Sequence, residues 1–466
     1  MTITSKNISF THLHQVTPSI RDISLTIQAG ECVLITGRSG SGKTTYSRIL
    51  NGLSPEYFEG DLSGENWTLT MKAGEAPIEA YAAHVGSVFQ NPKSQHFNIN
   101  TTHEMAFPCE NQGVEPEAIQ ERIQEVAQAF GIEHLLDRNI FELSGGEKQL
   151  IAFGAAAMMD PDVYILDEVT SNLDAQAIAS VARIIRLLKS QGRTIVIFDH
   201  RLAWTTDFVD RYLYFNQGAL TQEWTREALL GLSEVEREAL GLRPTDLSPY
   251  KATLQTKRIQ PIVSDTGLSA KKLAIGYDIH KPVKIDLNFT LEPGQVTGLM
   301  GPNGSGKSTL ARTLVGLEKP IAGEVRWQGQ AQKPKVLTKQ AFLVMQDTNY
   351  QLFSDSVEQE ILLGAAFPER ISDILEQLSL TDVREQHPMS LSGGQKQRVM
   401  IASALLSGKP FVVFDEPTSG LDMDNMMRFG EVLSYLKSQG FVVLLITHDE
   451  ELAALWCDQI LNMQEL

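Results

Sequence analysis

The chain has 466 residues, which is more than one ordinary hydrophobic core holds, so we expect two domains. Hydrophobic residues make up 42% and charged residues 21%, a balance typical of a soluble globular protein and not of a disordered or fibrous one. Acidic residues (57) outnumber basic ones (40), and the formal charge of −17 disfavours nucleic acid as a partner, because a phosphate backbone would meet a repulsive mean field.

The chain carries no strong signal for export or for membrane crossing. The N-terminal string MTITSKNISFTHLHQ lacks a basic region followed by an apolar run, so we expect no signal peptide. Apolar runs such as LIAFGAAAMM are shorter than the roughly 18 to 20 residues that cross a bilayer, so we expect no transmembrane helix, while docking onto a membrane stays open. Three cysteines without metal-ligand spacing indicate reduced thiols in a cytosolic protein: Cys32, Cys109 and Cys457.

The first motif joins an apolar run at 32–36 to the string GRSGSGKTT at 37–45. Two glycines around four residues, then Lys and a hydroxyl residue, match the P-loop pattern in its required context between a strand and a helix. Glycines let backbone N–H groups turn toward phosphates, Lys43 can neutralise phosphate oxygens, and the Thr44 hydroxyl can ligate magnesium. The predicted phosphate-binding residues are Gly37, Ser39, Gly40, Gly42, Lys43, Thr44 and Thr45.

Further polar residues follow later apolar runs. Gln90, after VF, is expected to contact the metal and the attacking water from a mobile loop. VYILDE at 163–168 ends a strand with two carboxylates, and we expect Asp167 to face magnesium and Glu168 to face the γ-phosphate and a water as general base. His200 is predicted to donate to the γ-phosphate and to orient the glutamate and the water.

The string LSGGEKQ at 143–149 is different in kind. It contains a serine and two glycines, Ser144, Gly145 and Gly146, but no histidine that could activate the serine as a nucleophile. It also lacks a cysteine or carboxylate cluster that could hold a metal.

The second half of the chain repeats these motifs in the same order. GPNGSGKST at 301–309 matches the first P-loop, and VMQ, LSGGQKQR, FVVFDE and ITHD match the later strings. The corresponding candidates are Gly301, Asn303, Gly304, Gly306, Lys307, Ser308, Thr309, Gln346, Asp415, Glu416 and His448. The polar, Pro-bearing segment 232–270 is the predicted linker between domains at 1–231 and 271–466.

The spacing of the two copies is informative. From the LSGG string onward, each motif of the first half recurs 248 positions later. Upstream the first half is longer, with 47 residues from the P-loop lysine to the glutamine against 39, and 54 from that glutamine to the LSGG serine against 46. Short, continuous apolar runs alternate with helix-like stretches in both halves, which predicts an α/β fold around a largely parallel sheet.

Together these strings resemble the ATP-binding cassette (ABC) family, and the resemblance covers nearly all of both halves. It implies two tandem P-loop NTPase cassettes, each with a mainly parallel β core and a helical subdomain whose signature helix starts at LSGG. It also implies an ATPase that uses ATP and Mg²⁺. In such cassettes the signature faces the P-loop of the opposite cassette, so a head-to-tail pair would form two shared ATP sites.

The signature residues are assigned accordingly. Ser392, Gly393 and Gly394 would complete the site of Lys43. Ser144, Gly145 and Gly146 would complete the site of Lys307.

The two halves depart from the family pattern unequally. The family places an aromatic residue before the P-loop to stack on adenine, and Tyr277 fits, whereas the first half has His12 with Phe10 nearby. The first half also has Val169 where the second has Pro417, and Leu150 where the second has Arg398. These departures concern nucleotide affinity, because the first half retains its magnesium and base residues.

Three classes of twin cassette remain open. QNPKSQHF after Gln90, QLF after Gln346, and DHR at 199–201 resemble the ATPases of energy-coupling factor (ECF) importers. Those work at the cytoplasmic face of the cell membrane with a membrane scaffold and a small membrane substrate-binding subunit, and import vitamins, vitamin precursors or transition-metal ions. Sugar-importer ATPases commonly lose one catalytic glutamate, which this chain keeps twice, and ribosome-binding twin cassettes usually have a longer, strongly basic linker.

Phe97 and Phe353 occupy matched strings after the two glutamines. We expect them, with apolar neighbours, to form grooves for an amphipathic helix of a membrane partner. The expected neighbours are Met105, Ala106 and Phe107 in the first half and Val357, Ile361 and Leu362 in the second.

Overall fold

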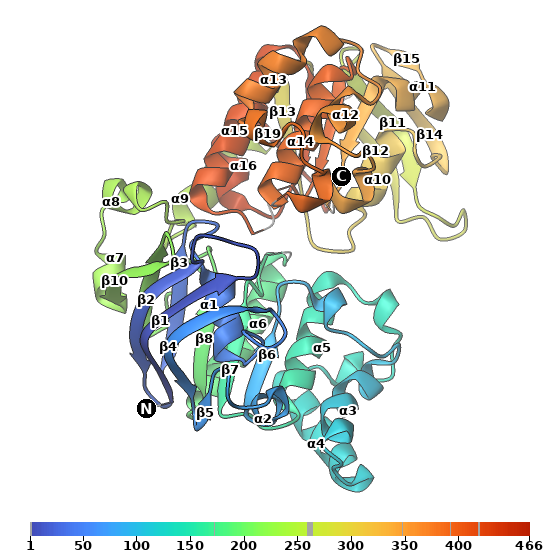
Figure 1. Cartoon of the computed structure of the whole chain (residues 1–466). Helices are drawn as coiled ribbons and strands as arrows, with labels where there is room; N and C mark the ends of the chain where they lie inside the picture. The colour runs from blue at the N-terminus through green and yellow to red at the C-terminus, as the bar shows by residue number, and fades with distance from the viewer. Residues whose placement is uncertain (1, 172, 259–263, 347, 392, 418–419) are drawn as a thin grey trace. The chain divides into compact units, whose positions relative to one another are not determined.

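The computed structural model describes residues 2–171, 173–258, 264–346, 348–391, 393–417 and 420–466 (Figure 1). The chain forms two compact units, Met1–Asp246 with Gly420–Asp424, and Leu247–Ser419 with Asn425–Leu466. The main division, between Asp246 and Leu247, lies inside the segment 232–270. The cassette bounds 1–231 and 271–466 stay predictions.

Two sheets form the β structure of the first unit. The strands of the larger sheet are β3 Cys32–Gly37, β6 Val85–Val88, β7 Val163–Asp167, β8 Thr194–Phe198, β9 Arg211–Asn216 and β10 Ala219–Thr225. Their order is β10-β9-β3-β8-β7-β6, and the pairs are parallel except β9 with β10. The smaller, antiparallel sheet contains β1 Ile3–His12, β2 Ile20–Ile27, β4 Gly60–Thr68 and β5 Met71–Lys72 in the order β2-β1-β4-β5.

The parallel strands are buried on both faces, as their continuous apolar sequences predict. In β3, Val33 and Ile35 pack into one hydrophobic cluster and Leu34 packs into another. The first cluster lies against the antiparallel sheet, since it includes Ile8 and Ile23 of β1 and β2. Helix packing on one face and sheet packing on the other therefore fix the carboxyl ends of the parallel strands.

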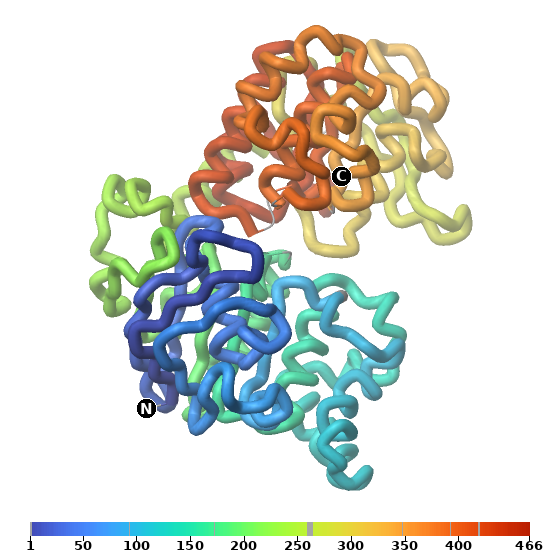
Figure 2. The backbone as a smooth tube through the Cα atoms, viewed as in Figure 1, coloured from blue at the N-terminus to red at the C-terminus, as the bar shows by residue number. Residues whose placement is uncertain are grey.

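The helices of the first unit are α1 Lys43–Leu50, α2 Ile78–His84, α3 Thr101–Asn111, α4 Pro116–Phe130, α5 Gly145–Ala157, α6 Ala175–Ser190, α7 Arg226–Leu230 and α8 Glu234–Ala239. Three of them, α3, α4 and α5, pack together as a helical subdomain, drawn in cyan and green in Figures 1 and 2. In both figures this group stands beside the blue strands of the same unit. The predicted helical signature subdomain is thus present.

The second unit repeats this plan. Its antiparallel sheet, β12-β11-β14-β15, is built from β11 Leu268–Ile275, β12 Lys284–Leu291, β14 Ala322–Trp327 and β15 Gln330–Ala331. Its parallel sheet is built from β13 Gln295–Met300, β16 Ala341–Val344, β17 Phe411–Asp415, β18 Val442–Ile446 and β19 Gln459–Asn462. The order of the parallel strands is β16-β17-β18-β13-β19.

The helices of the second unit are α9 Ser248–Lys257, α10 Lys307–Leu314, α11 Pro334–Gln340, α12 Val357–Leu362, α13 Ile371–Gln377, α14 Gly393–Leu406, α15 Met423–Ser438 and α16 Glu450–Trp456. Here α12, α13 and α14 form the helical subdomain. The middle helix α4 of the first unit has 15 residues, whereas its counterpart α13 has 7. That difference of eight accounts for the longer glutamine-to-serine interval of the first half.

Candidate functional site

The P-loops need glycine at the residue before each helix. Gly42 and Gly306 have φ values of 95° and 96°, a left-handed conformation that other residues rarely adopt. A Cβ on Gly42 would lie 2.5 Å from the Ser19 carbonyl oxygen, and one on Gly306 would lie 2.6 Å from Cγ1 of Val283. Glycine is therefore the residue that fits both turns, and it aims the first N–H groups of α1 and α10 into the loop.

The P-loop lysines fold back over their own loops. Lys43 Nζ donates to the carbonyls of Gly37 and Arg38 at 2.9 and 3.1 Å. Lys307 Nζ bonds the carbonyls of Gly301 and Pro302 at 2.9 and 3.0 Å. Burial lowers the pKa of Lys43, although the nearby Glu168 carboxylate opposes this effect. Each ammonium thus lies over the concave side of its loop.

The remaining predicted P-loop residues lie on the same two loops and on the first turns of the helices. They are Ser39, Gly40, Thr44 and Thr45 in the first unit and Asn303, Gly304, Ser308 and Thr309 in the second.

The aspartates at the ends of β7 and β17 contact hydroxyl side chains of α1 and α10. Ser47 Oγ donates to Asp167 Oδ2 at 3.1 Å, and burial, reinforced by the Glu168 charge, raises the pKa of Asp167 to about 7. Burial likewise raises the pKa of Asp415, against a hydrogen bond from the Ser308 side chain. Among the described residues, the buried Oδ1 of Asp415 has no hydrogen-bond partner. An unsatisfied carboxylate oxygen beside a hydroxyl suits Mg²⁺, which prefers oxygen ligands.

The glutamates that follow these aspartates have an unusual backbone. Glu168 and Glu416 adopt φ values of 47° and 52°, in the left-handed region that costs energy for residues other than glycine. Their N–H groups donate to the carbonyls of Phe198 and Ile446 on the neighbouring strands at 2.7 and 3.0 Å. The strained turn directs each glutamate away from the aspartate before it.

The Glu168 carboxylate joins three predicted site residues. Gln90 Nε2 donates to Oε2 at 2.7 Å, and His200 Nε2 lies 3.4 Å from Oε1. Burial would raise the pKa of Glu168, but the hydrogen bond and charge of His200, with the charge of Lys43, outweigh it and hold that pKa below its ordinary value. The structure therefore brings Lys43, Gln90, Glu168 and His200 together, with an ionised carboxylate at the centre.

The second unit has the same pair of histidine and glutamate, and its histidine also contacts the P-loop. His448 Nε2 lies 3.1 Å from Glu416 Oε1 and 2.8 Å from the Asn303 Oδ1 of the P-loop. Gln346 lies two residues beyond the end of β16, as Gln90 does beyond β6. The first unit has Ser39 at the position of Asn303, so the amide contact belongs to the second unit.

The signature helix of the first unit begins with a complete capping box. Ser144 Oγ accepts from the Glu147 N–H at 3.3 Å, and Glu147 Oε2 accepts from the Ser144 N–H at 2.8 Å. Burial disfavours the charge of Glu147, but hydrogen bonds from the Ser144 side chain and the Ser144 N–H lower the pKa of Glu147. A Cβ on Gly145, or on Gly393 at the start of α14, would meet no atom within 4 Å. Ser392 lies outside the described residues.

The candidate adenine platforms occupy corresponding places. Tyr277, 67% exposed, accepts a 3.4 Å hydrogen bond at its hydroxyl from Thr309 Oγ1, and His12 Nε2 lies 3.2 Å from Thr45 Oγ1. Burial, followed by the charge of Arg48, lowers the pKa of His12, so its ring is neutral at pH 7. Phe10 is fully buried and cannot stack on a base.

Two matched contacts that the sequence reasoning missed shape the segments after the glutamines. Gln95 bonds the backbone of Ser87 and Phe89, and Gln351 bonds that of Leu343 and Met345 in the same way. The buried Glu104 accepts from the N–H groups of residues 97 and 98 at 3.0 and 2.7 Å, and Glu360 accepts from those of 353 and 354, both at 2.7 Å. All four side chains recur at the spacing of 256 that separates Gln90 from Gln346, a signal that could have revealed them.

These contacts direct Phe97 and Phe353 into solvent. The two side chains are 73% and 77% exposed. The expectation that Met105, Ala106, Val357 and Ile361 flank them in a groove is wrong, because these four residues are buried in the core. Leu362 is half-buried, and Phe107 stacks on Phe97 with ring centroids 5.1 Å apart.

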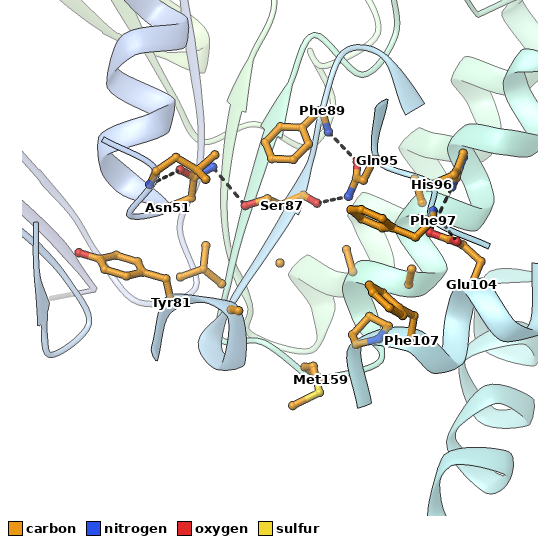
Figure 3. Close-up of a pocket in the computed structure, with 18 of the residues that line it drawn as sticks. Asn51, Tyr81, Ser87, Phe89, Gln95, His96, Phe97, Glu104, Phe107 and Met159 are labelled. Carbon is orange, nitrogen blue, oxygen red and sulfur yellow. Dashed lines mark hydrogen bonds and ion pairs between the residues drawn. The ribbon is translucent and has the colours of Figure 1, made fainter. Parts of the chain in front are cut away.

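A cavity of about 280 Å³ opens beside Phe97 in the first unit (Figure 3). Figure 3 shows the Phe97 and Phe107 rings on one side of it, Tyr81 on the other, and Met159 at its lower edge. Gln95, His96 and Glu104 also line it, and His96 stands where the second unit has Leu352. The cavity is thus a mainly apolar hollow, partly lined by aromatic rings, with a polar edge next to the Gln90 loop.

Among the described residues, no helix has both the length and the hydropathy that a bilayer crossing requires.

A P-loop at the carboxyl end of one strand of a parallel sheet, with an acidic pair at the end of the next strand but one, defines a P-loop nucleoside triphosphatase, and the chain contains two. Residues 20–171 and 285–419 both match the family model described as ABC transporter, and this chain belongs to that family as an ABC ATPase with two cassettes.

Relatives and solved structures agree with this assignment. A Treponema denticola protein named as an ABC transporter ATP-binding protein is 40% identical over 465 residues, which cover 98% of this chain and 94% of that protein. A Bacillus subtilis protein named for HMP/thiamine import, the ATP-binding protein YkoD, is 30% identical over 497 residues, covering 99% and 90%. The structure of an RNase-L inhibitor superposes with a TM-score of 0.63 over 98% of this chain and 87% of that one, and its 21% identity indicates a shared fold alone.

Proposed function

We propose that this chain is the energising subunit of an ECF-type importer, which hydrolyses ATP to drive uptake of a vitamin, a vitamin precursor or a transition-metal ion. Its partners in this proposal are an integral-membrane scaffold and a small membrane substrate-binding subunit, and it works at the cytoplasmic face of the cell membrane. The observation that carries the proposal is the matched pair of exposed phenylalanines, Phe97 and Phe353, each held outward by a buried glutamate.

At each nucleotide site, the chain's own groups divide the work. Lys43 and Lys307, with the N–H groups of their loops, hold the phosphates. Glu168 and Glu416 act as general bases that accept a proton from the attacking water, and the ionised state of Glu168 suits that role. His200 and His448 hold these carboxylates and donate to the γ-phosphate.

Magnesium fits the oxygen groups beside each P-loop. Thr44, Gln90 and Asp167 would hold it in the first unit, and Ser308, Gln346 and Asp415 in the second. The ion supplies charge neutralisation for the phosphates when it is bound.

The two signatures complete the sites in trans within a head-to-tail pair of cassettes. Ser144, Gly145 and Gly146 serve the site of Lys307. Ser392, Gly393 and Gly394 serve the site of Lys43. The open space around Gly145 and Gly393 supports this role, since it suits the approach of a phosphate.

The apolar cavity of the first unit is the docking place for an amphipathic helix of the scaffold. It lies between the Gln90 loop and the helical subdomain, so a change at the γ-phosphate reaches the docked helix through residues 90 to 97. The relative named for HMP/thiamine import supports a vitamin or vitamin precursor as cargo.

Two alternatives are an ATPase of a sugar importer and a ribosome-binding translation factor. Both glutamates are present here, whereas fused sugar-importer ATPases commonly lose one. The segment 232–270 is not strongly basic, and the likeness to the RNase-L inhibitor concerns the fold alone.

An uptake assay tests the proposal. Cells that lack the gene are complemented with the wild-type chain or with the double variant Glu168→Gln and Glu416→Gln, and offered labelled thiamine, its pyrimidine precursor, other vitamins, Co²⁺, Ni²⁺ and maltose. We expect uptake of one vitamin, precursor or metal to require the wild-type chain. If only maltose uptake required the wild-type chain, the result would favour the alternative of a sugar importer.

A further inference from the structure

Three side chains of the first unit connect the two strand ends that carry Glu168 and His200. Thr170 Oγ1 donates to Asp199 Oδ2 at 2.7 Å, and the Arg201 N–H donates to Asp199 Oδ1 at 2.9 Å. Arg201 Nη1 also donates to the Thr170 carbonyl at 3.4 Å. We call Thr170, Asp199 and Arg201 the clasp.

The clasp lies directly around the proposed base and its histidine. Asp199 precedes His200, and Thr170 follows Glu168 by two residues. Thr170 is fully buried and Asp199 is 4% exposed, so water does not compete for these bonds. Two backbone bonds continue the link, since the Ser171 N–H donates to the Glu168 carbonyl and the Glu168 N–H donates to the Phe198 carbonyl. Glu168 and His200 are thus joined through the clasp as well as through their own contact.

The second unit has other residues at two of these three positions. Thr447 and Asp449 stand at the positions of Asp199 and Arg201, so both the carboxylate and the guanidinium are missing. Thr447 Oγ1 keeps only the backbone contact, and it accepts from the Asp449 N–H at 3.0 Å. Asp449 instead caps α16, where its Oδ1 accepts from the Leu452 N–H at 3.1 Å. The second unit supports its histidine from the other side, through the 2.8 Å contact between His448 and Asn303.

We propose that Asp199, Thr170 and Arg201 are positioning residues of the first ATP site, which hold the Glu168 and His200 pair in register where the second site uses Asn303. The inference rests on the proposed role of Glu168 and not on the transported cargo. In this proposal the two ATP sites hold the catalytic histidine and glutamate through different side chains. Loss of the clasp impairs bond cleavage at the first site and leaves nucleotide binding there intact, because the P-loop does not depend on it.

The test uses the full chain with Glu416→Gln, so that the first site supplies the cleavage, and follows single-turnover hydrolysis of radiolabelled ATP with Mg²⁺. We expect Asp199→Thr, which installs the residue of the second unit, to slow cleavage about tenfold or more, since small displacements of catalytic groups have large effects. The Kd for ATP should stay within about twofold. Thr170→Val removes the hydroxyl from the other end and should give the same result.

Conservative variants separate positioning from folding. Asp199→Asn and Thr170→Ser keep the hydrogen bonds and should restore cleavage to within about threefold of the parent chain. In the mirrored background, Glu168→Gln, the change Thr447→Val should alter cleavage at the second site less than about twofold.

Unchanged cleavage in Asp199→Thr would overturn the inference. Conservative variants as slow as Asp199→Thr, or an equal loss in Thr447→Val, would also contradict it. A parent chain that does not cleave ATP at all would contradict the role of Glu168 itself, which is a different failure.

Discussion

Burial and backbone strain determine the orientation and the pKa of carboxylates in the nucleotide sites. The left-handed turns at Glu168 and Glu416 rotate two adjacent carboxylates of each unit toward different partners. The Glu168 carboxylate stays ionised although it is buried, because His200 and Lys43 oppose the cost of burial. Catalysis by these glutamates should therefore be separable from nucleotide binding, which the P-loop supplies.

We expect Glu168→Gln and Glu416→Gln each to slow ATP turnover at their own sites by on the order of a hundredfold to ten-thousandfold, because a positioned base is lost. ATP binding should persist, since Lys43 and Lys307 are unchanged. Steady-state phosphate release and equilibrium ATP binding by the purified chain check both statements. Normal turnover in the double variant would show that neither glutamate is the base.

Glu104 contributes stability through a buried, charge-assisted contact. Burial disfavours its charge, but the His96 ring, with Nδ1 3.5 Å from Oε1, and hydrogen bonds from the N–H groups of Asn98 and Phe97 outweigh this and hold the pKa of Glu104 below its ordinary value. A lowered folded pKa means that the stabilisation is present above the unfolded pKa and is lost as the pH falls through the folded pKa.

We expect Glu104→Gln to lower the free energy of unfolding at pH 7 by about 1 to 2 kcal/mol, because the variant replaces charged with neutral hydrogen bonds. The deficit should be the same at pH 5. It should shrink as the pH falls from the ordinary pKa of a glutamate, where the unfolded chain takes up a proton, to the lowered pKa at which folded Glu104 becomes neutral. Urea unfolding across this range measures it. Glu110→Gln, an exposed change on the same helix, is the control, and an equal effect there would refute the role of the buried contact.

At the scale of elements, the sequence predicted the parallel strands, the P-loops and the starts of the signature helices. Continuous apolar runs mark β3 and β7 because these strands are buried on both faces. The antiparallel sheets were not predicted, since β1 and β11 mix exposed and buried residues and contain register shifts. The contacts of Asp199 were missed because they depend on which strand ends lie together, and that follows from topology. Gln95 left a signal in the sequence, since it recurs as Gln351 at the spacing of the two glutamines.

The signature helices offer a matched test of the proposed trans arrangement. Gly145 and Gly393 begin α5 and α14, and an added methyl group at either place meets open space within its own unit. Gly145→Ala should therefore leave folding intact while it crowds the phosphate at the site of Lys307.

We expect Gly145→Ala to weaken ATP use at the Lys307 site by on the order of tenfold, and Gly393→Ala to do the same at the Lys43 site, because a methyl group displaces the phosphate from its donors. Photocrosslinking with 8-azido-ATP, followed by proteolysis that separates the two P-loop peptides, assigns each effect. Labelling lost at the P-loop of the same cassette would exclude the head-to-tail pairing.

At the scale of the whole molecule, the chain is a twin-cassette ATPase whose two units repeat one plan with unequal details. The two units differ in three features. The first has His12 where the second has Tyr277, it has the clasp, and its helix α4 is longer than α13. The exposed Phe97 and Phe353 are instead shared, with the same buried glutamate behind each. Because both units keep this exposed phenylalanine, we assign it to the proposed docking of the chain to a membrane scaffold.

Cell fractionation on a density gradient tests that proposal most directly, with the wild-type chain and the double variant Phe97→Ser and Phe353→Ser compared in the native host. The wild-type chain should travel with the membranes, and the variant should leave them while its purified form keeps its ATPase activity, because each lost anchor costs about 2 kcal/mol or more of binding. Migration of the wild-type chain with ribosomes, or unchanged membrane association of the variant, would contradict the account.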